Sequence, residues 1–125
     1  MKVLYIEDHL SQRDIMQQRL EQWGCEVVVA SDGFKGIETA LKWRPDIILM
    51  DLRMPRMDGL TAIRKLKRRD STLSDIPIVA ISAWDAKGLR DATLRSGAVR
   101  FIKKPFESEQ LIQIMKEVVA KEAVK

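Results

Sequence analysis

The fold is decided by the stretch from Asp46 to Gly59, which reads Asp-Ile-Ile-Leu-Met-Asp-Leu-Arg-Met-Pro-Arg-Met-Asp-Gly. Four apolar residues, Ile47 to Met50, lead directly into Asp51, and turn signals follow at Met54-Pro55 and Asp58-Gly59. A short apolar run that is rich in branched side chains and ends at turn signals is typical of a strand buried on both faces. Because a carboxylate inside a dry strand is costly, the position of Asp51 at the strand's exit indicates a functional site rather than part of the core.

Apolar runs alternate with helical patterns along the rest of the chain. Strands are expected at Lys2–Ile6, Glu26–Ala30, residues 47–50, Ile76–Ile81 and Val99–Ile102. A helical pattern follows each of these strands. Five near-continuous apolar strands that alternate with five helices predict an α/β fold, in which a doubly wound parallel sheet carries helices on both faces.

The helical patterns also predict which side chains face the sheet. In the first helix this face is expected to hold Ile15, Met16, Leu20 and Trp23, and in the second helix Phe34, Ile37 and Leu41. The helix after the fourth strand has the weakest pattern, because Leu89 and Ala92 make a thin apolar stripe and Gly88 interrupts it. This helix is therefore expected to be the element that is most easily repositioned.

Length and composition favour one globular domain. The chain has 125 residues, of which 46% are hydrophobic and 32% charged, so it is neither disordered nor unusually apolar. We expect a single domain over residues 1–125, with a core at about 2–119 and a short charged tail at 120–125. The lone Cys25 rules out an internal disulfide and suits a buried, reduced thiol. Because no apolar run approaches the ~20 residues of a membrane span, a cytoplasmic protein without membrane contact is expected.

The net charge of +4 is concentrated in the basic run Arg64-Lys65-Leu66-Lys67-Arg68-Arg69. Such a cluster could contact nucleic acid or another anionic partner. It also suits the solvated carboxyl end of a helix, where cations complement the helix dipole. No aromatic side chain interrupts the run, as a single-strand binder would require, so direct nucleic-acid binding is not expected.

Polar residues follow four of the five expected strands. They are Glu7 and Asp8, Asp51, Ser82, and Lys104. Ligands of a doubly wound sheet bind where the strands end, so these side chains are expected to gather at one edge of the molecule. Three carboxylates in one place repel one another unless a cation lies among them, and oxygen ligands without Cys or a His cluster favour Mg²⁺. The only histidine, His9, is expected in a surface loop.

An ammonium and a hydroxyl opposite the three acids provide what a transferred phosphoryl group needs for its oxygens. Lys104 and Ser82 supply these groups, and Asp51 becomes the candidate nucleophile, which would form an acyl phosphate.

These motifs resemble the receiver domains of two-component response regulators, over roughly residues 2 to 119. The resemblance rests on Glu7-Asp8, on Met50 to Gly59, on Ser82-Ala83 and on Lys104-Pro105. It implies a flavodoxin-like sheet with strand order 2-1-3-4-5. It also implies that Asp51 is the phospho-acceptor and that Mg²⁺ is held by Glu7, Asp8, Asp51 and the backbone carbonyl of Arg53.

The resemblance assigns further roles around that site. Ser82 is similar to the hydroxyl that follows the phosphoryl group, and Lys104 to the lysine that pairs with it. Pro105 resembles the proline whose preceding peptide bond is cis, and Phe101 takes the place of the switch aromatic. The predicted output face is the fourth helix, the fifth strand and the fifth helix. Arg53 and Trp84 flank the phosphoryl position, and we hypothesise that Trp84 slows hydrolysis by hindering water.

Three positions depart from the commonest form of the family. Glu7 stands where many members have Asp, which is expected to move its metal contact outward, through water. Ser82 replaces Thr and loses a methyl group that would restrict its rotation. Phe101 replaces Tyr and therefore lacks a hydroxyl. None of these changes removes a group that the expected chemistry needs.

Two other classes of protein are disfavoured. An aspartate-nucleophile phosphohydrolase needs a second acid two residues after the nucleophile, and Arg53 is found there. A flavodoxin-type flavin-binding module needs a phosphate loop after the first strand, where Glu7 and Asp8 would repel phosphate. The protein is therefore expected to be a signalling domain rather than an enzyme, although it assists its own phosphoryl transfer and dephosphorylation.

The expected phosphoryl donor is a sensor histidine kinase or a phosphotransfer protein, and the expected output is contact with a downstream protein. Met1 directly before the first strand and the short charged tail favour a stand-alone regulator, which is expected to be a monomer or a weak, phosphorylation-dependent dimer. The alternative is a receiver module taken from a hybrid kinase or a DNA-binding regulator.

Overall fold

The structure is a computed structural model that describes residues 1–68, 70–84 and 86–124. Arg69 of the basic run and Lys125 of the tail lie outside the described residues. The strands are β1 (Lys2–Ile6), β2 (Glu26–Ala30), β3 (Ile47–Asp51), β4 (Ile78–Ser82) and β5 (Arg100–Lys103). The helices are α1 (Leu10–Gln22), α2 (Gly33–Trp43), α3 (Gly59–Leu66), α4 (Leu89–Ser96) and α5 (Ser108–Val124).

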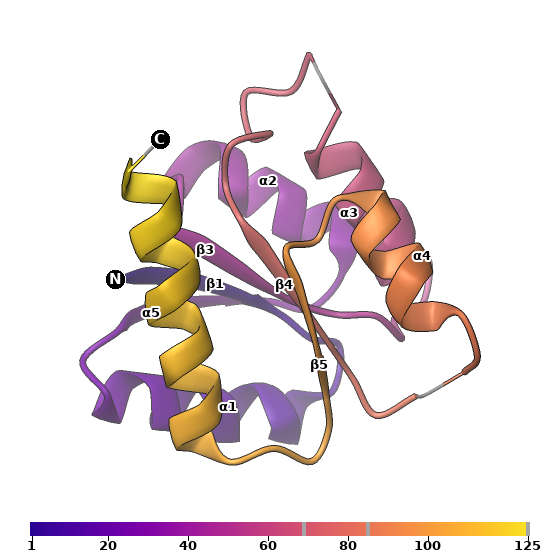
Figure 1. The fold of residues 1–125 in the computed structure, drawn as a ribbon. Coiled ribbons are helices and arrows are strands. Elements are labelled where there is room, and N and C mark those ends of the chain that lie inside the picture. The colour runs from indigo at the N-terminus through magenta and orange to yellow at the C-terminus, as the bar shows by residue number, and fades with distance from the viewer. Residues whose placement is uncertain (69, 85, 125) are drawn as a thin grey trace.

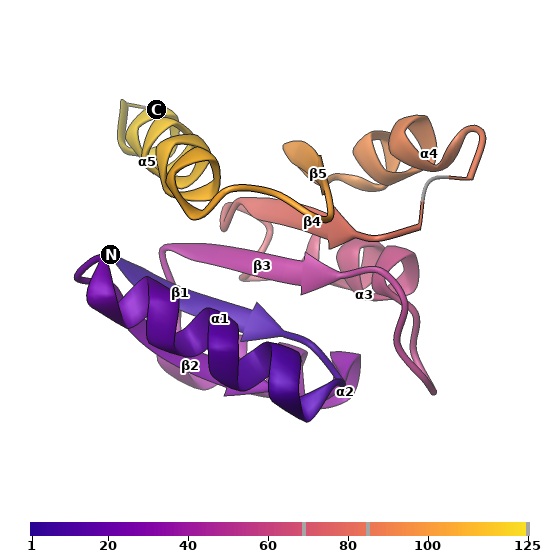
Figure 2. The same cartoon turned by 90° about the horizontal axis from the view of Figure 1, so that it is seen from below.

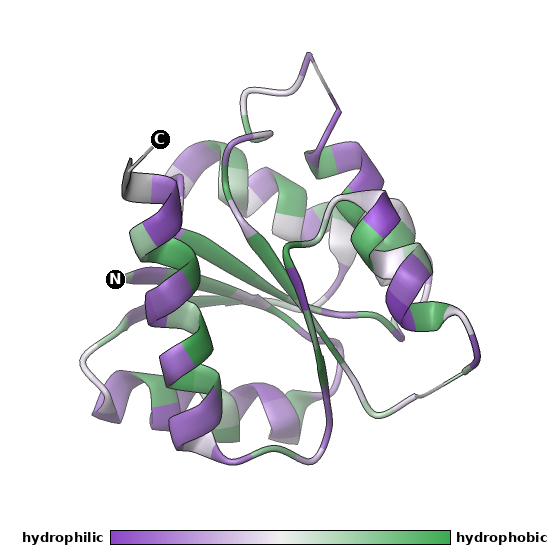
Figure 3. Cartoon of the chain, viewed as in Figure 1, coloured by the Kyte–Doolittle hydropathy of each residue, from purple (hydrophilic) through white to green (hydrophobic). Residues whose placement is uncertain are grey.

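The five strands form one parallel sheet with the order β2-β1-β3-β4-β5 (Figure 1). This confirms the predicted doubly wound topology. Every residue of β3 and β4 is buried, as expected for strands covered by helices on both sides. Figure 3 shows the hydrophobic colouring running along the central strands, while the helices carry both hydrophilic and hydrophobic residues.

Two cores lie on opposite faces of the sheet (Figure 2). Helices α1 and α5 cover one face, where Tyr5, Leu20 and Met115 are buried. Helices α2, α3 and α4 cover the other face, where Ile6 and Ile63 are buried. Because the side chains of a strand alternate between the faces, neighbouring residues of β1 contribute to different cores.

The bounds of β4 and β5 differ from the sequence prediction, and β3 extends one residue further than predicted, to Asp51. β4 begins at Ile78 rather than Ile76, because the missing amide hydrogen of Pro77 delays entry into the ladder. The strand then continues to Ser82, and β5 is likewise shifted by one residue, to Arg100–Lys103. Ser82 pairs with Lys103, so the ends of the two strands lie side by side at the functional edge.

The predicted buried faces of α1 and α2 were partly wrong. In α1, Met16 and Leu20 are buried, whereas Ile15 and Trp23 are exposed. In α2, Phe34 and Leu41 are exposed, contrary to the prediction, whereas Ile37 is partly buried and packs against the core. The face that meets the sheet consists of Gly33, Gly36 and Ala40.

The cause is the close approach of α2 to β1. A Cβ atom at Gly36 would overlap the Cδ1 atom of Ile6, so only a residue without a side chain fits there. A prediction based on large apolar residues misses such a face, because small residues carry the contact.

Candidate functional site

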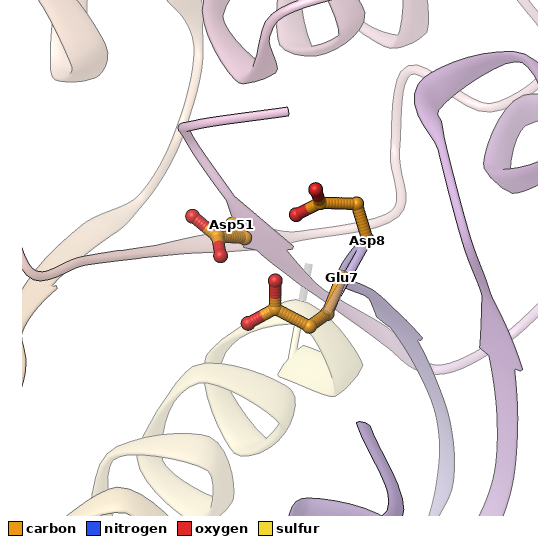
Figure 4. Close-up of side chains that lie close together, drawn as sticks. All are labelled: Glu7, Asp8 and Asp51. Carbon is orange, nitrogen blue, oxygen red and sulfur yellow. The ribbon is translucent and has the colours of Figure 1, made fainter. Parts of the chain in front are cut away.

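Three carboxylates meet where β1 and β3 end. One oxygen from each of Glu7, Asp8 and Asp51 can be chosen so that all three atoms lie within 4.8 Å of one another. Figure 4 shows the three side chains gathered around one space. The sequence places them there because β1 and β3 are neighbours in the sheet and both run toward the same edge.

Asp51 is the last residue of β3, and only 7% of its surface is exposed. Its Oδ1 atom accepts a hydrogen bond of 3.0 Å from the backbone N–H of Arg53. The backbone N–H of Leu52 donates to the carbonyl of Ile81 at 3.2 Å, and Gly59 N–H donates to the carbonyl of Leu52 at 3.0 Å. These bonds turn the chain away from the sheet and fix the carboxylate at the strand's end.

Glu7 is buried, although it directly follows β1, with 1% of its surface exposed. Its Oε1 atom accepts from the hydroxyl of Tyr5 at 3.2 Å and from Lys104 Nζ at 3.0 Å, and its Oε2 atom accepts from the backbone N–H of His9 at 3.3 Å. Burial raises the pKa of Glu7, and the neighbouring Asp51 raises it further, while Lys104 acts in the opposite direction. The free-energy cost of burying the charged Glu7 carboxylate is thus only partly offset by its neighbours.

Lys104 reaches over the cleft from the segment that follows β5. Its Nζ atom lies 3.0 Å from Glu7 Oε1, 3.6 Å from Asp51 Oδ2 and 2.7 Å from Gln12 Oε1. Its backbone N–H donates to the carbonyl of Ser82 at 2.9 Å, and the Lys104–Pro105 peptide bond is cis, as the family resemblance implied. The ammonium is therefore held by the acids themselves.

Ser82 ends β4 and is fully buried. Its Oγ atom accepts a hydrogen bond of 2.9 Å from the backbone N–H of Trp84. The guanidinium of Arg53 lies 5.5 Å from the ring centroid of Trp84, close enough for a cation–π contact. Arg53 and Trp84 both line a hollow beside the acids, so the two residues predicted to flank the phosphoryl position lie together at the mouth of the site.

The acids open into a cleft of about 250 Å³. It is lined by Glu7, Asp8, His9, Gln12, Asp51, Arg53, Ala83 and Lys104. His9 is exposed, as predicted, and its Nδ1 atom lies 3.1 Å from Ser11 Oγ. The metal-ligand group consists of three carboxylates, and they outnumber the two cations that line the cleft, Arg53 and Lys104, which favours binding of a divalent cation. Hard oxygen ligands of this kind fit Mg²⁺.

Phe101 does not line the cleft and belongs to the core on the face of the sheet that α2, α3 and α4 cover. Its ring is buried, and the guanidinium of Arg90, from α4, lies 5.0 Å from the ring centroid. The sequence placed Phe101 at the switch position but did not predict this cover by Arg90.

Other residues of the site were also missed by the sequence prediction. Gln12 holds Lys104, and Arg13 Nη1 donates to the carbonyls of Glu7 and Asp8 at 3.0 and 3.2 Å, which fixes the turn after β1. Tyr5 holds Glu7. A signal was present only for Tyr5, because a phenol inside an apolar strand requires a hydrogen-bond partner.

The chain matches the family model described as the response regulator receiver domain over residues 3–116. It belongs to this family. Response regulator MprA of Mycobacterium leprae is 36% identical over 112 residues, which cover 90% of this chain and 48% of that protein. MprA of Mycobacterium avium is 34% identical over 119 residues, which cover 95% of this chain and 51% of that protein. The receiver chain thus spans about half the length of the curated relatives it matches.

Solved receiver structures show the same fold. The receiver domain of the sensor histidine kinase PA1611 from Pseudomonas aeruginosa PAO1 has a magnesium ion coordinated in its active site cleft. It is 28% identical to this chain, with a TM-score of 0.86, and the match covers 95% of this chain and 97% of that one. Chemotaxis protein CheY4 of Vibrio cholerae is 29% identical, with a TM-score of 0.86 and coverage of 94% and 97%.

Proposed function

We propose that this receiver domain accepts a phosphoryl group on Asp51 in a Mg²⁺-dependent step. The observation that carries the proposal is the meeting of three carboxylates, one of them Asp51, with Lys104 in one cleft at the sheet edge. A bound Mg²⁺, held by Glu7, Asp8, Asp51 and the Arg53 carbonyl, would neutralise charge on the phosphoryl oxygens.

The transfer requires one bond to form and one to break. An oxygen of Asp51 attacks the phosphorus of a phosphohistidine, and the P–N bond breaks as the phosphoryl group leaves the imidazole. The product is an acyl phosphate, and the imidazole nitrogen takes up a proton. Asp51 is well placed for this attack, because Arg53 N–H holds one oxygen and the carboxylate lines the cleft.

Lys104 has to change partners during the reaction. Its ammonium is engaged by Glu7 and Gln12 and lies 3.6 Å from Asp51. A phosphoryl group on Asp51 brings new anionic oxygens within reach, and Lys104 turns toward them. The hydroxyl of Ser82 follows, exchanging the N–H of Trp84 for a phosphoryl oxygen.

These movements connect the cleft to the proposed output face of α4, β5 and α5. Lys104 N–H is bonded to the Ser82 carbonyl, so the ends of β4 and β5 move together. Phe101, on β5, then takes up the space that Ser82 vacates, and α4 follows because Arg90 lies over the ring. The thin contact of α4, which buries Leu89 and Thr93, makes it the element most easily displaced.

We further propose that the donor is a histidine kinase or a phosphotransfer protein that docks beside α1. A groove of about 240 Å³ next to the cleft is lined by apolar groups, including Ile15, Pro105 and Phe106. Trp23 is also exposed, and it lines a neighbouring pocket together with Phe106. An amphipathic helix seated there would bring its phosphohistidine to the adjoining cleft.

The remaining features of the proposal concern the cell. The domain acts as a signalling element rather than as an enzyme on other substrates. It works in the cytoplasm, as a monomer or weak dimer. Its output is contact with a downstream protein, without direct contact with nucleic acid. Among the described residues, no helix is both long enough and apolar enough to cross a membrane. The stand-alone form and the module of a longer regulator both remain compatible with the site.

Incubation with acetyl phosphate and Mg²⁺, followed by intact-mass measurement, tests the chemistry. We expect the mass to increase by one phosphoryl group. The increase should be absent in Asp51→Asn and when EDTA removes the Mg²⁺. Asp58→Asn is the matched control, because Asp58 caps α3 outside the acid cluster. No increase at any Mg²⁺ concentration, or an unchanged increase in Asp51→Asn, would overturn the proposal.

A further inference from the structure

Tyr5 is a buried phenol in an otherwise apolar strand. Its surface is 1% exposed, and its hydroxyl lies 3.2 Å from Glu7 Oε1. Because residues two apart on a strand point to the same face, Tyr5 and Glu7 both lie on the side of the sheet that α1 and α5 cover. Within the described part of the chain, Glu7 is the only hydrogen-bond partner of this hydroxyl.

The same carboxylate oxygen also accepts from Lys104, at 3.0 Å. We expect these two donors to behave differently once Asp51 is phosphorylated. Lys104 also lies 3.6 Å from Asp51 Oδ2 and turns toward a phosphoryl group once one is bound there. Glu7 then loses its ion pair, whereas the hydroxyl of Tyr5 keeps Glu7 as its one hydrogen-bond partner among the described residues.

We propose that Tyr5 is a positioning residue of the metal site, which keeps the carboxylate of Glu7 directed toward Asp8 and Asp51 whether or not Lys104 is bound to it. This inference rests on the proposed Mg²⁺ function. The partner that holds a metal-ligating side chain from behind fixes its orientation and tunes its affinity for the ion.

The length of the Glu7 side chain supports the pairing. An aspartate at this position would be shorter by one C–C bond, about 1.5 Å, which places its oxygens beyond hydrogen-bond reach of the phenol. Tyr5 and Glu7 therefore form a matched pair. Their contact gives a structural reason for glutamate at position 7, where the commonest family pattern has aspartate.

The state of the hydroxyl also supports this role. The hydroxyl of Tyr5 is the donor in this contact, because a carboxylate oxygen can only accept a hydrogen bond. Two acceptors cannot face each other at this distance, and a lasting donor is what a buried carboxylate requires.

The test is a double-mutant cycle on Mg²⁺ binding, measured by isothermal titration calorimetry. Tyr5→Phe removes one oxygen atom and leaves the ring packing intact. We expect the Kd for Mg²⁺ to rise about tenfold. In a Glu7→Asp background the same substitution should leave the Kd unchanged, because the shorter side chain has already lost the contact.

Thr93→Val is the matched control. It removes a fully buried hydroxyl that donates to the Leu89 carbonyl at 2.7 Å, in α4 and away from the acids. Its Kd for Mg²⁺ should equal that of the unsubstituted chain. A second readout is phosphorylation by acetyl phosphate, whose rate in Tyr5→Phe should recover to that of the unsubstituted chain when Mg²⁺ is saturating.

Several results would overturn the inference. They are an unchanged Kd in Tyr5→Phe, an equal loss in the Glu7→Asp background or in Thr93→Val, and a slow phosphorylation rate that saturating Mg²⁺ does not restore. Failure of the proposed function looks different, because the unsubstituted chain would then bind no Mg²⁺ or would not be phosphorylated on Asp51.

Discussion

At the scale of single residues, the site is governed by an imbalance of charge. Glu7, Asp8 and Asp51 line their cleft together with two basic residues, Lys104 and Arg53, so the acids outnumber the cations there. Lys104 is bound to Glu7 and lies close to Asp51, so it moderates the repulsion without removing it. The raised pKa of Glu7 reflects its burial first and Asp51 second. The charges of the unphosphorylated site therefore favour the binding of a cation.

Trp84 offers a prediction at this scale. Its half-exposed ring stacks with Arg53 beside the cleft, where it can hinder the water that hydrolyses an acyl phosphate. We expect Trp84→Ala to shorten the lifetime of the phosphorylated form about fivefold, which corresponds to a lower barrier of about 1 kcal/mol. The loss of phosphate can be followed by intact mass after acetyl phosphate is removed.

Trp23→Ala is the control for this measurement, because Trp23 is also an exposed tryptophan but lies at the end of α1. Its phosphorylated form should decay at the rate of the unsubstituted chain. Equal lifetimes for Trp84→Ala and the unsubstituted chain would refute the shielding role.

At the scale of elements, the contact between α2 and β1 depends on small residues. Gly36→Ala places a Cβ atom against the Cδ1 atom of Ile6 in a fully buried part of the core. Because core overpacking typically costs 1–3 kcal/mol, we expect the free energy of unfolding to fall by about 2 kcal/mol. Urea unfolding measures this change.

Glu38→Ala is a suitable comparison, since it lies on the same helix and its side chain is exposed. Its ion pair with Lys42 is solvated, so the substitution should alter stability by less than about 0.5 kcal/mol. If Gly36→Ala proved equally mild, the close packing of α2 on β1 would not limit stability.

The elements also show what the sequence could reveal. Strong apolar runs predicted the strands, because a short run of branched apolar residues between turn signals is typical of a strand buried on both faces. Their order in the sheet came from the family resemblance. The polar residues at the strand ends followed from this topology. The face of α2 was predicted incorrectly, since Gly36 and Ala40 carry no hydrophobic signal. Contacts such as Arg90 with Phe101 depend on tertiary placement, which no spacing in the sequence encodes.

At the scale of the whole molecule, cation binding should stabilise the fold. An ion that binds only the folded chain adds about 2.7 kcal/mol at 100 times its Kd. For a domain of 125 residues we expect Mg²⁺ to raise the Tm by on the order of 10 °C. Differential scanning calorimetry over a series of Mg²⁺ concentrations measures the shift.

Asp51→Asn should abolish the stabilisation of the fold by Mg²⁺. Without Mg²⁺ its Tm should exceed that of the unsubstituted chain, by the equivalent of about 1 kcal/mol, because Glu7 no longer faces a second carboxylate while it keeps Lys104. With Mg²⁺ its Tm should hardly change. A full Mg²⁺ shift in Asp51→Asn would show that the stabilising ion binds somewhere other than the acid cluster.

The outer strand β5 also affects how copies of the molecule meet. It forms one open edge of the sheet, has four residues, and runs from Arg100 to Lys103. The unpaired N–H and C=O groups of an edge strand can pair with a strand of another molecule, and long uncharged edges promote aggregation in this way. The short length of β5 and the charged residues at its ends, Arg100 and Lys103, disfavour such pairing. If β5 moves as proposed, its short charged edge therefore disfavours association of one copy with another through this strand.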